Sequence, residues 1–148
     1  MPYRFSKQYI QKGTLYLSVG LFVISLSREV FCTNNDCSGD WSGLAILFSG
    51  TFGFFLSPAG FVWLANPLLF FSWRYIKRDP KNTLITSIAS SILAISFLFF
   101  KRIVADEAGS YYHITGYRIG YWLWLTSVIT MLVGNLLVKF GKYSDVTS

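Results

Sequence analysis

Residues 41–73 of the chain are WSGLAILFSGTFGFFLSPAGFVWLANPLLFFSW, a run without an ionisable side chain between Asp40 and Arg74. A run this apolar is not stable as an exposed segment in water, and it is typical of chain embedded in a membrane. As one straight helix it would be about 50 Å long, whereas the hydrocarbon core of a bilayer is about 30 Å thick. The run must therefore contain a bend or a turn.

The composition of the whole chain is also that of a membrane protein. Hydrophobic residues make up 53% of it and charged residues only 14%, against about 25% charged in a typical soluble domain. The net charge is +6, and the basic residues lie mostly beside apolar runs, where they orient a protein in the membrane. We therefore expect one polytopic domain, residues 1–148, with the lipid bilayer as a partner and no nucleic-acid binding.

The best place to divide the long run is Ser57-Pro58. Serine is favoured at the N-cap of a helix and proline at its first position, so a helix is predicted to begin here. Residues 58–77 would form about 30 Å of helix, which is one span. Residues 41–56 are too short to cross comfortably, and we expect an apolar outer segment that is interfacial or re-entrant. A second crossing is the alternative.

Three further apolar runs predict membrane spans, at residues 11–31, 82–100 and 119–138. The predicted fold is an all-α membrane protein with four transmembrane helices and the short outer segment packed on them. The first run follows a basic leader, so it also fits a secretory signal peptide cleaved after Ser27. We prefer a spanning helix, because Arg28 and Glu29 can lie at the interface.

Cys32 and Cys37 lie at the most polar and turn-rich part of the chain, residues 33–41. Their spacing is not the C-x-x-C of redox and zinc sites, and the chain has no second pair of ligands. We predict a disulfide that closes a tight loop, in preference to two free thiols. Because disulfides persist in oxidising compartments, this loop should face outward.

The distribution of lysine and arginine predicts the orientation. With four spans, nine of them lie on the side of the termini and four on the other side. The nine are Arg4, Lys7, Lys12, Arg74, Lys77, Arg78, Lys81, Lys139 and Lys142, and the four are Arg28, Lys101, Arg102 and Arg118. Since the more basic side of a membrane protein faces the cytoplasm, both termini are expected to be cytoplasmic.

Two patterns of small residues indicate close helix contacts. The run 82–100 carries Thr83, Ser87, Ser91 and Ala94 on one helical face. Such a face lets transmembrane helices approach closely, although a polar pore lining would also contain serine and threonine. Gly116 and Gly120 form a G-x-x-x-G at the start of the last span, which likewise indicates a close helix contact.

The candidate interaction and kink residues are Trp41, Pro58, Asn66, Pro67, Trp122 and Trp124. Pro67 removes the hydrogen bond to the carbonyl of Trp63 and should kink the helix, although the freed carbonyl could also bind an ion. Tyr121, Trp122 and Trp124 open the last span, where we expect an aromatic belt that anchors the helix at the interface.

The sequence has no pattern of a catalytic site. The spans hold no ionisable residue in their central turns, and G-x-S-x-G, H-E-x-x-H and a suitably spaced Cys–His pair are all absent. Asp106, Glu107 and His113 share one polar loop, 101–118, which we expect to be simply solvated. We expect no enzymatic activity, no metal and no cofactor.

Two stretches, WLANPLLFFSW (63–73) and GYWLWL (120–125), resemble a broad group of small, uncharacterised bacterial membrane proteins with four spans. The resemblance covers most of residues 32–138 and rests on apolar motifs. It implies a four-helix protein of the bacterial inner membrane, and it implies no catalytic residue.

These features favour a protein that acts through interaction, such as an accessory subunit, a sensor or an immunity protein against a membrane-acting toxin. Its expected partner is another protein or a second copy of the chain. The alternative is a small oligomeric channel or carrier, with Asn66 or the serine face of the third span along the path. We expect a partner or ligand site within residues 41–60, beside the cysteine loop.

Overall fold

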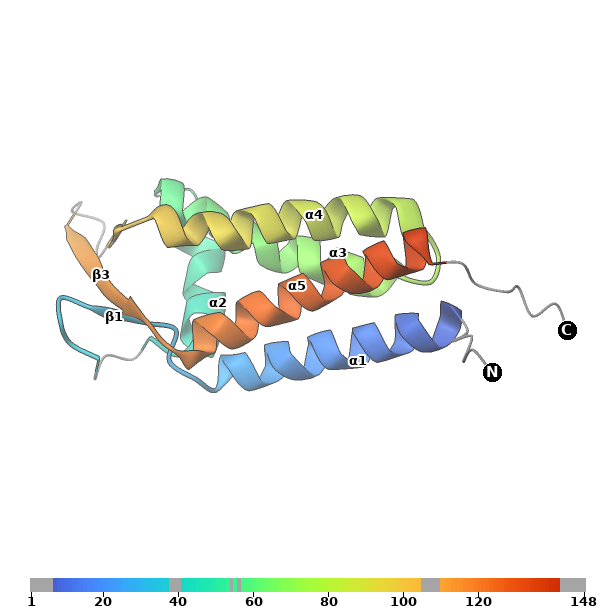
Figure 1. Cartoon of the computed structure of the whole chain (residues 1–148). Coiled ribbons are helices and arrows are strands. Elements are labelled where there is room, and N and C mark those ends of the chain that lie inside the picture. The colour runs from blue at the N-terminus through green and yellow to red at the C-terminus, as the bar shows by residue number, and fades with distance from the viewer. Residues whose placement is uncertain (1–6, 38–40, 54, 56, 105–109, 142–148) are drawn as a thin grey trace, which may run out of the picture.

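The computed structural model describes residues 7–37, 41–53, 55, 57–104 and 110–141. Long helices run side by side, and a small sheet lies at one end of them (Figure 1). The elements in chain order are α1 (Lys7–Leu26), β1 (Phe31–Thr33), α2 (Gly43–Gly53), the 3-10 helix η1 (Pro58–Leu64), α3 (Ala65–Tyr75), α4 (Pro80–Ser96), the 3-10 helix η2 (Phe97–Phe99), β2 (Arg102–Val104), β3 (Tyr111–Tyr117) and α5 (Ile119–Phe140). We call the end of the bundle that carries the strands the sheet end.

The fold is mostly helical and is that of a membrane protein. α1, Pro80–Phe99 and α5 are each long and apolar enough to cross a membrane. α2 and Pro58–Tyr75 are bent by 112° from one another, and they add a fourth crossing if they form one broken span. The described chain thus supports three to four spans, where the sequence predicted four. In Figure 1, α2 lies crosswise to the long helices at the sheet end.

The sheet corrects the prediction of an all-α fold, in which segments 33–41 and 101–118 were expected to be loops. It has three antiparallel strands in the order β1-β3-β2, with Phe31 opposite Tyr117. β3 has the sequence YYHITGY, whose aromatic and β-branched residues favour strands. Because α5 follows β3 almost directly, the sheet fixes where α5 begins.

The predicted disulfide between Cys32 and Cys37 is present and closes a loop with four residues between the cysteines. The residues at its tip, Asn34 and Asn35, have positive φ values of 50° and 64°. This is the conformation of a type I′ turn, which asparagine tolerates. The amide of Asn34 also donates to the carbonyl of His113 in β3, at 2.9 Å. The loop is therefore held on the sheet as well as by its disulfide.

α1 ends at Leu26, so the predicted first span, which extended to Phe31, is too long at this end. The residues beyond the helix pair with other parts of the chain instead. The amide of Val30 donates to the carbonyl of Trp41 at 2.9 Å, and the carbonyl of Val30 accepts from the amide of Arg118 at 2.8 Å. Tertiary pairing therefore overrides the helical preference of this apolar run.

The predicted helix 58–77 is in fact two helices of different type. Ser57 is the N-cap, as expected, and its hydroxyl accepts from the amide of Gly60 at 3.1 Å. The seven residues that follow form the 3-10 helix η1, and only then does the α-helix α3 begin. The predicted helix start at Ser57-Pro58 is therefore confirmed, whereas the prediction of one continuous helix over residues 58–77 is wrong.

The change of helix type lies beside Asn66-Pro67, where the sequence predicted a kink. α3 begins at Ala65, so Pro67 lies in its first turn, where a missing amide breaks no helical hydrogen bond. The carbonyl of Trp63 accepts from the side-chain amide of Asn66 at 3.1 Å. That carbonyl is therefore bonded within the protein.

The small face of α4 is confirmed as a packing face. Its residues are buried, none more than 3% exposed: Thr83, Ser87, Ser91 and Ala94. The side-chain amide of Asn135 in α5 donates to the hydroxyl of Ser87 at 3.2 Å. The hydroxyl of Ser90 donates to the carbonyl of Ala65 at 2.8 Å. Small polar residues thus bond α4 to both α5 and α3.

A reciprocal pair of serines joins α1 to α5. The hydroxyl of Ser18 donates to the carbonyl of Ser127 at 3.0 Å, and the hydroxyl of Ser127 donates to the carbonyl of Ser18 at 2.7 Å. The indole Nε1 of Trp73 in α3 donates to the Ser18 hydroxyl at 2.9 Å. Both serines are fully buried, so α1 is an integral part of the bundle.

The G-x-x-x-G of the sequence is not a contact between two helices. At Gly120 a Cβ atom would stand 2.5 Å from the carbonyl oxygen of Glu29, in the segment after α1. The Gly120 amide donates to the same oxygen at 2.9 Å. Gly116 lies in β3, and a Cβ atom there would meet nothing within 4 Å. Only Gly120 therefore makes a close approach, and its neighbour is backbone.

Gly120→Ala should lower the free energy of unfolding by about 1–3 kcal/mol, because overpacking against backbone forces a shift of the chain. Gly116→Ala is the matched control and should change it by less than about 0.5 kcal/mol, as substitutions in open positions do. Both are measured by circular dichroism during titration of mixed micelles with dodecyl sulfate. Equal losses for the two variants would contradict the close approach at Gly120.

Candidate functional site

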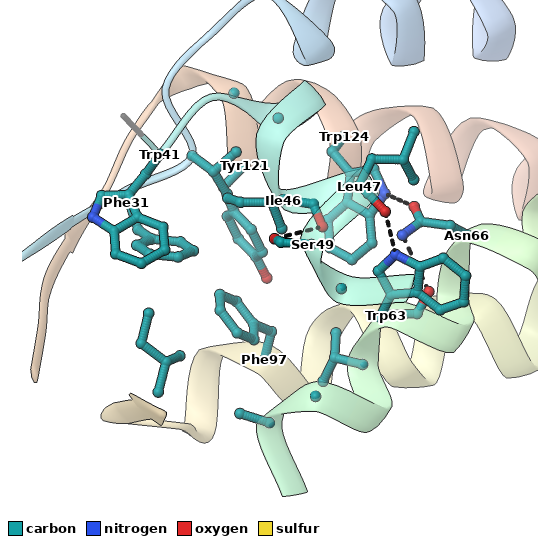
Figure 2. A pocket seen from close by; sticks show the side chains of 18 of the residues that line it. Phe31, Trp41, Ile46, Leu47, Ser49, Trp63, Asn66, Phe97, Tyr121 and Trp124 are labelled. Carbon is teal, nitrogen blue, oxygen red and sulfur yellow. Dashed lines mark hydrogen bonds between the residues drawn. The ribbon is translucent and has the colours of Figure 1, made fainter. Parts of the chain in front are cut away.

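A cavity of about 540 Å³ lies at the sheet end, between α2 and the helices of the bundle (Figure 2). Its wall is drawn from the end of α1, β1, α2, η1, the start of α3, η2, β2 and the start of α5. This volume falls within the range of about 300–1,000 Å³ of small-molecule sites in proteins. The wall includes much of the segment 41–60, in which the sequence analysis expected a partner or ligand site.

α2 forms one side of the cavity. Its Ile46, Leu47 and Gly50 line it, whereas Phe48 and Phe52 point away from the bundle and are 66% and 84% exposed. α2 is therefore apolar on both sides, which suits a helix between the cavity and lipid. Its 11 residues measure about 16 Å, which is too short for a span.

Glycine lets α2 begin against the end of α1. A Cβ atom at Gly43 would stand 2.6 Å from the carbonyl oxygen of Ser25. The Gly43 amide donates to the carbonyl of Arg28 at 2.9 Å, and the hydroxyl of Ser42 accepts from the amide of Ala45 at 3.3 Å. These contacts fix the position of the first turn of α2 against the end of α1, and the rest of the helix runs crosswise to the long helices (Figure 1).

An aromatic cluster forms the part of the wall opposite α2. Phe31 packs on Trp41 and Phe97, with ring centroids 5.1 Å and 5.9 Å apart, and Phe97 packs on Tyr121 at 5.8 Å. The hydroxyl of Tyr121 donates to the carbonyl of Ala94 at 2.9 Å. The cluster joins β1, η2 and α5 and makes the wall rigid and apolar.

A chain of hydrogen bonds ties α2 to the bundle along another part of the wall (Figure 2). The indole Nε1 of Trp63 donates to the carbonyl of Leu47 in α2 at 2.9 Å. The Asn66 side chain donates to the carbonyl of Trp63 at 3.1 Å and accepts from Nε1 of Trp124 in α5 at 2.9 Å. Asn66 is therefore the junction between α3, η1 and α5.

The buried polar side-chain atoms of the wall are bonded to the protein. The hydroxyl of Ser25 donates to the carbonyl of Phe22 at 2.6 Å, and Nε1 of Trp41 donates to the hydroxyl of Thr33 at 3.1 Å. Across the described chain, no buried side-chain nitrogen or oxygen lacks a hydrogen-bond partner. Apart from Tyr121, the described lining residues include no ionisable side chain. The cavity thus offers shape and mostly apolar surface.

The cavity is partly open, and its surface is mostly apolar. An apolar occupant would remove this surface from water and gain contacts with the rings of the wall, which is favourable. Water suits the cavity less well, because a bound water molecule needs two to four polar partners.

The structure separates the candidate residues into two groups. Trp41, Asn66 and Trp124 line the cavity. Pro58 begins η1 and Pro67 lies in α3, and neither is part of the wall. Asp106 and Glu107 lie outside the described residues, and His113 lies in β3. The described chain has no group of three or more His, Cys, Asp or Glu that could hold a metal ion.

The predicted aromatic belt at the start of α5 is wrong for two of its three members. Tyr121 is fully buried, and Trp124 donates to Asn66 inside the protein. Trp122 is 46% exposed and is the member that fits an interfacial anchor. Sequence alone does not tell which helical face of an aromatic cluster meets lipid, so the buried position of Tyr121 in the wall was not predicted, and neither were Phe31 and Phe97.

Comparison with protein families, curated proteins and solved structures finds nothing that matches this chain. The resemblance to small four-span membrane proteins therefore stays a prediction, and the geometry of the cavity is the basis for inferring a function.

Asn66→Leu should lower the free energy of unfolding by about 1–3 kcal/mol, because it leaves the Trp124 indole and the Trp63 carbonyl without their side-chain partner. Trp124→Phe removes one of the same bonds, so its effect should not add to that of Asn66→Leu. Trp122→Phe is the matched control and should have little effect. Additive losses in the double variant, measured by circular dichroism in mixed micelles, would contradict the junction.

Proposed function

We propose that this chain is a non-catalytic integral membrane protein that acts by binding an uncharged, apolar ligand in the cavity beneath α2. The observation that supports this best is the wall of the cavity. It combines rigid aromatic surface with polar atoms that are already bonded to the protein, which favours apolar contact over chemistry.

Binding at this place suits a sensor, an accessory subunit or an immunity protein against a membrane-acting toxin. α2 has one face on the cavity and the other, with Phe48 and Phe52, exposed to the surroundings. A ligand that shifts α2 would change the surface offered to a protein partner or to a second copy of the chain. We propose that this shift of α2 transmits ligand binding to the partner.

A channel or carrier has less support. The serines of α4 that could line a polar path are buried and bonded inside the bundle. Ser90 donates to Ala65, Ser91 donates to the carbonyl of Ser87, and Ser87 accepts from Asn135. Asn66 is engaged with Trp63 and Trp124. These bonds favour a packing role for the polar residues.

We further propose that the chain lies in the bacterial inner membrane with both termini in the cytoplasm. The excess of basic residues on the side of the termini supports this orientation. α1 begins and α5 finishes at the same end of the bundle (Figure 1), as an even number of crossings requires. The disulfide loop, at the other end, would then be in the oxidising periplasm.

The orientation is tested by fusing alkaline phosphatase, which is active only in the periplasm, at two positions. A fusion after Asp79, between α3 and α4, should be inactive. A fusion after Ser110, next to β3, should be active. Activity at Asp79 would contradict the proposed orientation.

The binding function is tested with 1-aminoanthracene, a small apolar fluorophore, added to the purified protein in amphipol. Its emission should rise with saturable binding to the native chain. Ala59 lines the cavity, so Ala59→Phe should obstruct part of it and weaken binding at least tenfold. Ala45 is exposed on α2 outside the cavity, so Ala45→Phe is the matched control and should bind normally. Equal binding by the two variants would reject the cavity as the site.

A further inference from the structure

We infer that the ligand is one acyl chain of a membrane phospholipid, with its headgroup outside the cavity. This inference rests on the proposed binding function and names the chemical class of its ligand. Four properties of the described chain point to it: the volume of the cavity, the chemistry of its wall, the charges around it and the exposure of α2.

The volume suits a single chain. Small groups such as water occupy about 30 Å³ each in a condensed phase. On that scale a cavity of about 540 Å³ has room for roughly 18 methylene-sized groups. That is the size of one acyl chain, so the second chain and the headgroup of a phospholipid would lie outside the cavity.

The chemistry of the wall favours binding of a hydrocarbon tail over binding of a polar group. The amide of Asn66 and the indole nitrogens of Trp63 and Trp124 are committed to bonds within the protein. A headgroup, sugar or peptide placed inside would lose water and meet mostly apolar surface, which is costly. A hydrocarbon chain has no hydrogen bonds to lose, and it gains contact with Phe31, Phe97 and the other rings.

Residues of both charges precede wall residues in the sequence, so the charges do not select one type of headgroup. Arg28 and Glu29 precede Val30, and Lys101 and Arg102 precede Ile103, where Val30 and Ile103 line the cavity. Arg118 forms an ion pair with Glu29 at 3.3 Å, with both side chains about half exposed. Because both signs of charge are present, we expect binding to depend on the tail and little on the headgroup.

The exposure of α2 favours a lipid of the membrane over a fatty acid from solution. The face of α2 away from the cavity carries Leu44, Phe48 and Phe52, all exposed, and such a face is stable only against hydrocarbon. Acyl chains of the bilayer therefore lie one helix away from the cavity. A chain from this source is already in hydrocarbon, whereas a fatty acid from solution must first partition into the bilayer.

The experiment uses nanodiscs that contain a phosphatidylcholine with a diazirine group within one acyl chain. After photolysis, the modified residues are mapped by mass spectrometry of peptides. Val62 and Phe31 line the cavity and are only 5% exposed, so they should be labelled only by a chain inside it. Ile88 and Ile92 are exposed on α4 and report the surrounding lipid.

In the native chain, label should appear at Val62 or Phe31 as well as on α4. In Ala59→Phe it should fall at least tenfold at the cavity positions and stay unchanged on α4. Ile46→Trp, which fills the cavity from α2, serves as a second variant if Ala59→Phe does not fold. Phosphatidylglycerol with the same chain should give the same pattern, and label that depends on the headgroup would overturn the inference.

A second arm replaces the phospholipid probe by a diazirine fatty acid. Cavity label from the fatty acid alone would overturn the phospholipid as the source. If 1-aminoanthracene binds but no acyl probe labels Val62 or Phe31, the inference fails while the proposed binding function stands. If neither the fluorophore nor an acyl probe enters, both fail.

Discussion

The structure depends on one constraint, which is that a polar group in hydrocarbon must find its partner within the protein. The fold meets this constraint with short side chains that bond across helices. Ser18 and Ser127 bond to each other's carbonyls, and Asn135 bonds to Ser87. Because these side chains are short, the helices must lie close together for the bonds to form, so the same residues set both the hydrogen bonding and the spacing of the bundle.

The same constraint explains how an irregular stretch is tolerated at the sheet end. Between α2 and α3 the chain turns and forms a 3-10 helix, so regular α-helical bonding is interrupted there. Asn66, Trp63 and Trp124 supply the missing partners from their side chains. These bonds also hold α2 away from the bundle at a fixed distance, and the cavity is the space that results.

Features determined by neighbouring residues could be predicted from the sequence, and features determined by distant residues could not. The cap at Ser57, the small face of α4 and the disulfide of Cys32 with Cys37 are local patterns, and the structure contains all three. The sheet was missed because β1 and β3 are far apart in sequence, and the strand signal in each is short. The cavity is lined in part by residues 41–60, where the sequence predicted a partner or ligand site, but its aromatic wall, including Tyr121, is assembled from distant elements and has no signature in one stretch.

The serine pair between α1 and α5 has a consequence for how the protein is made. Ser18 and Ser127 are 109 residues apart, and a ribosome adds about 5–20 residues per second. α1 therefore waits about 5–20 s before its partner helix is synthesised. During that time Ser18 has no α5 to pack against, and its hydroxyl faces either lipid or another protein. Membrane insertion of this chain thus includes an interval before α5 is present. During it, the insertion machinery or temporary contacts must supply the polar partners that α5 later provides to α1.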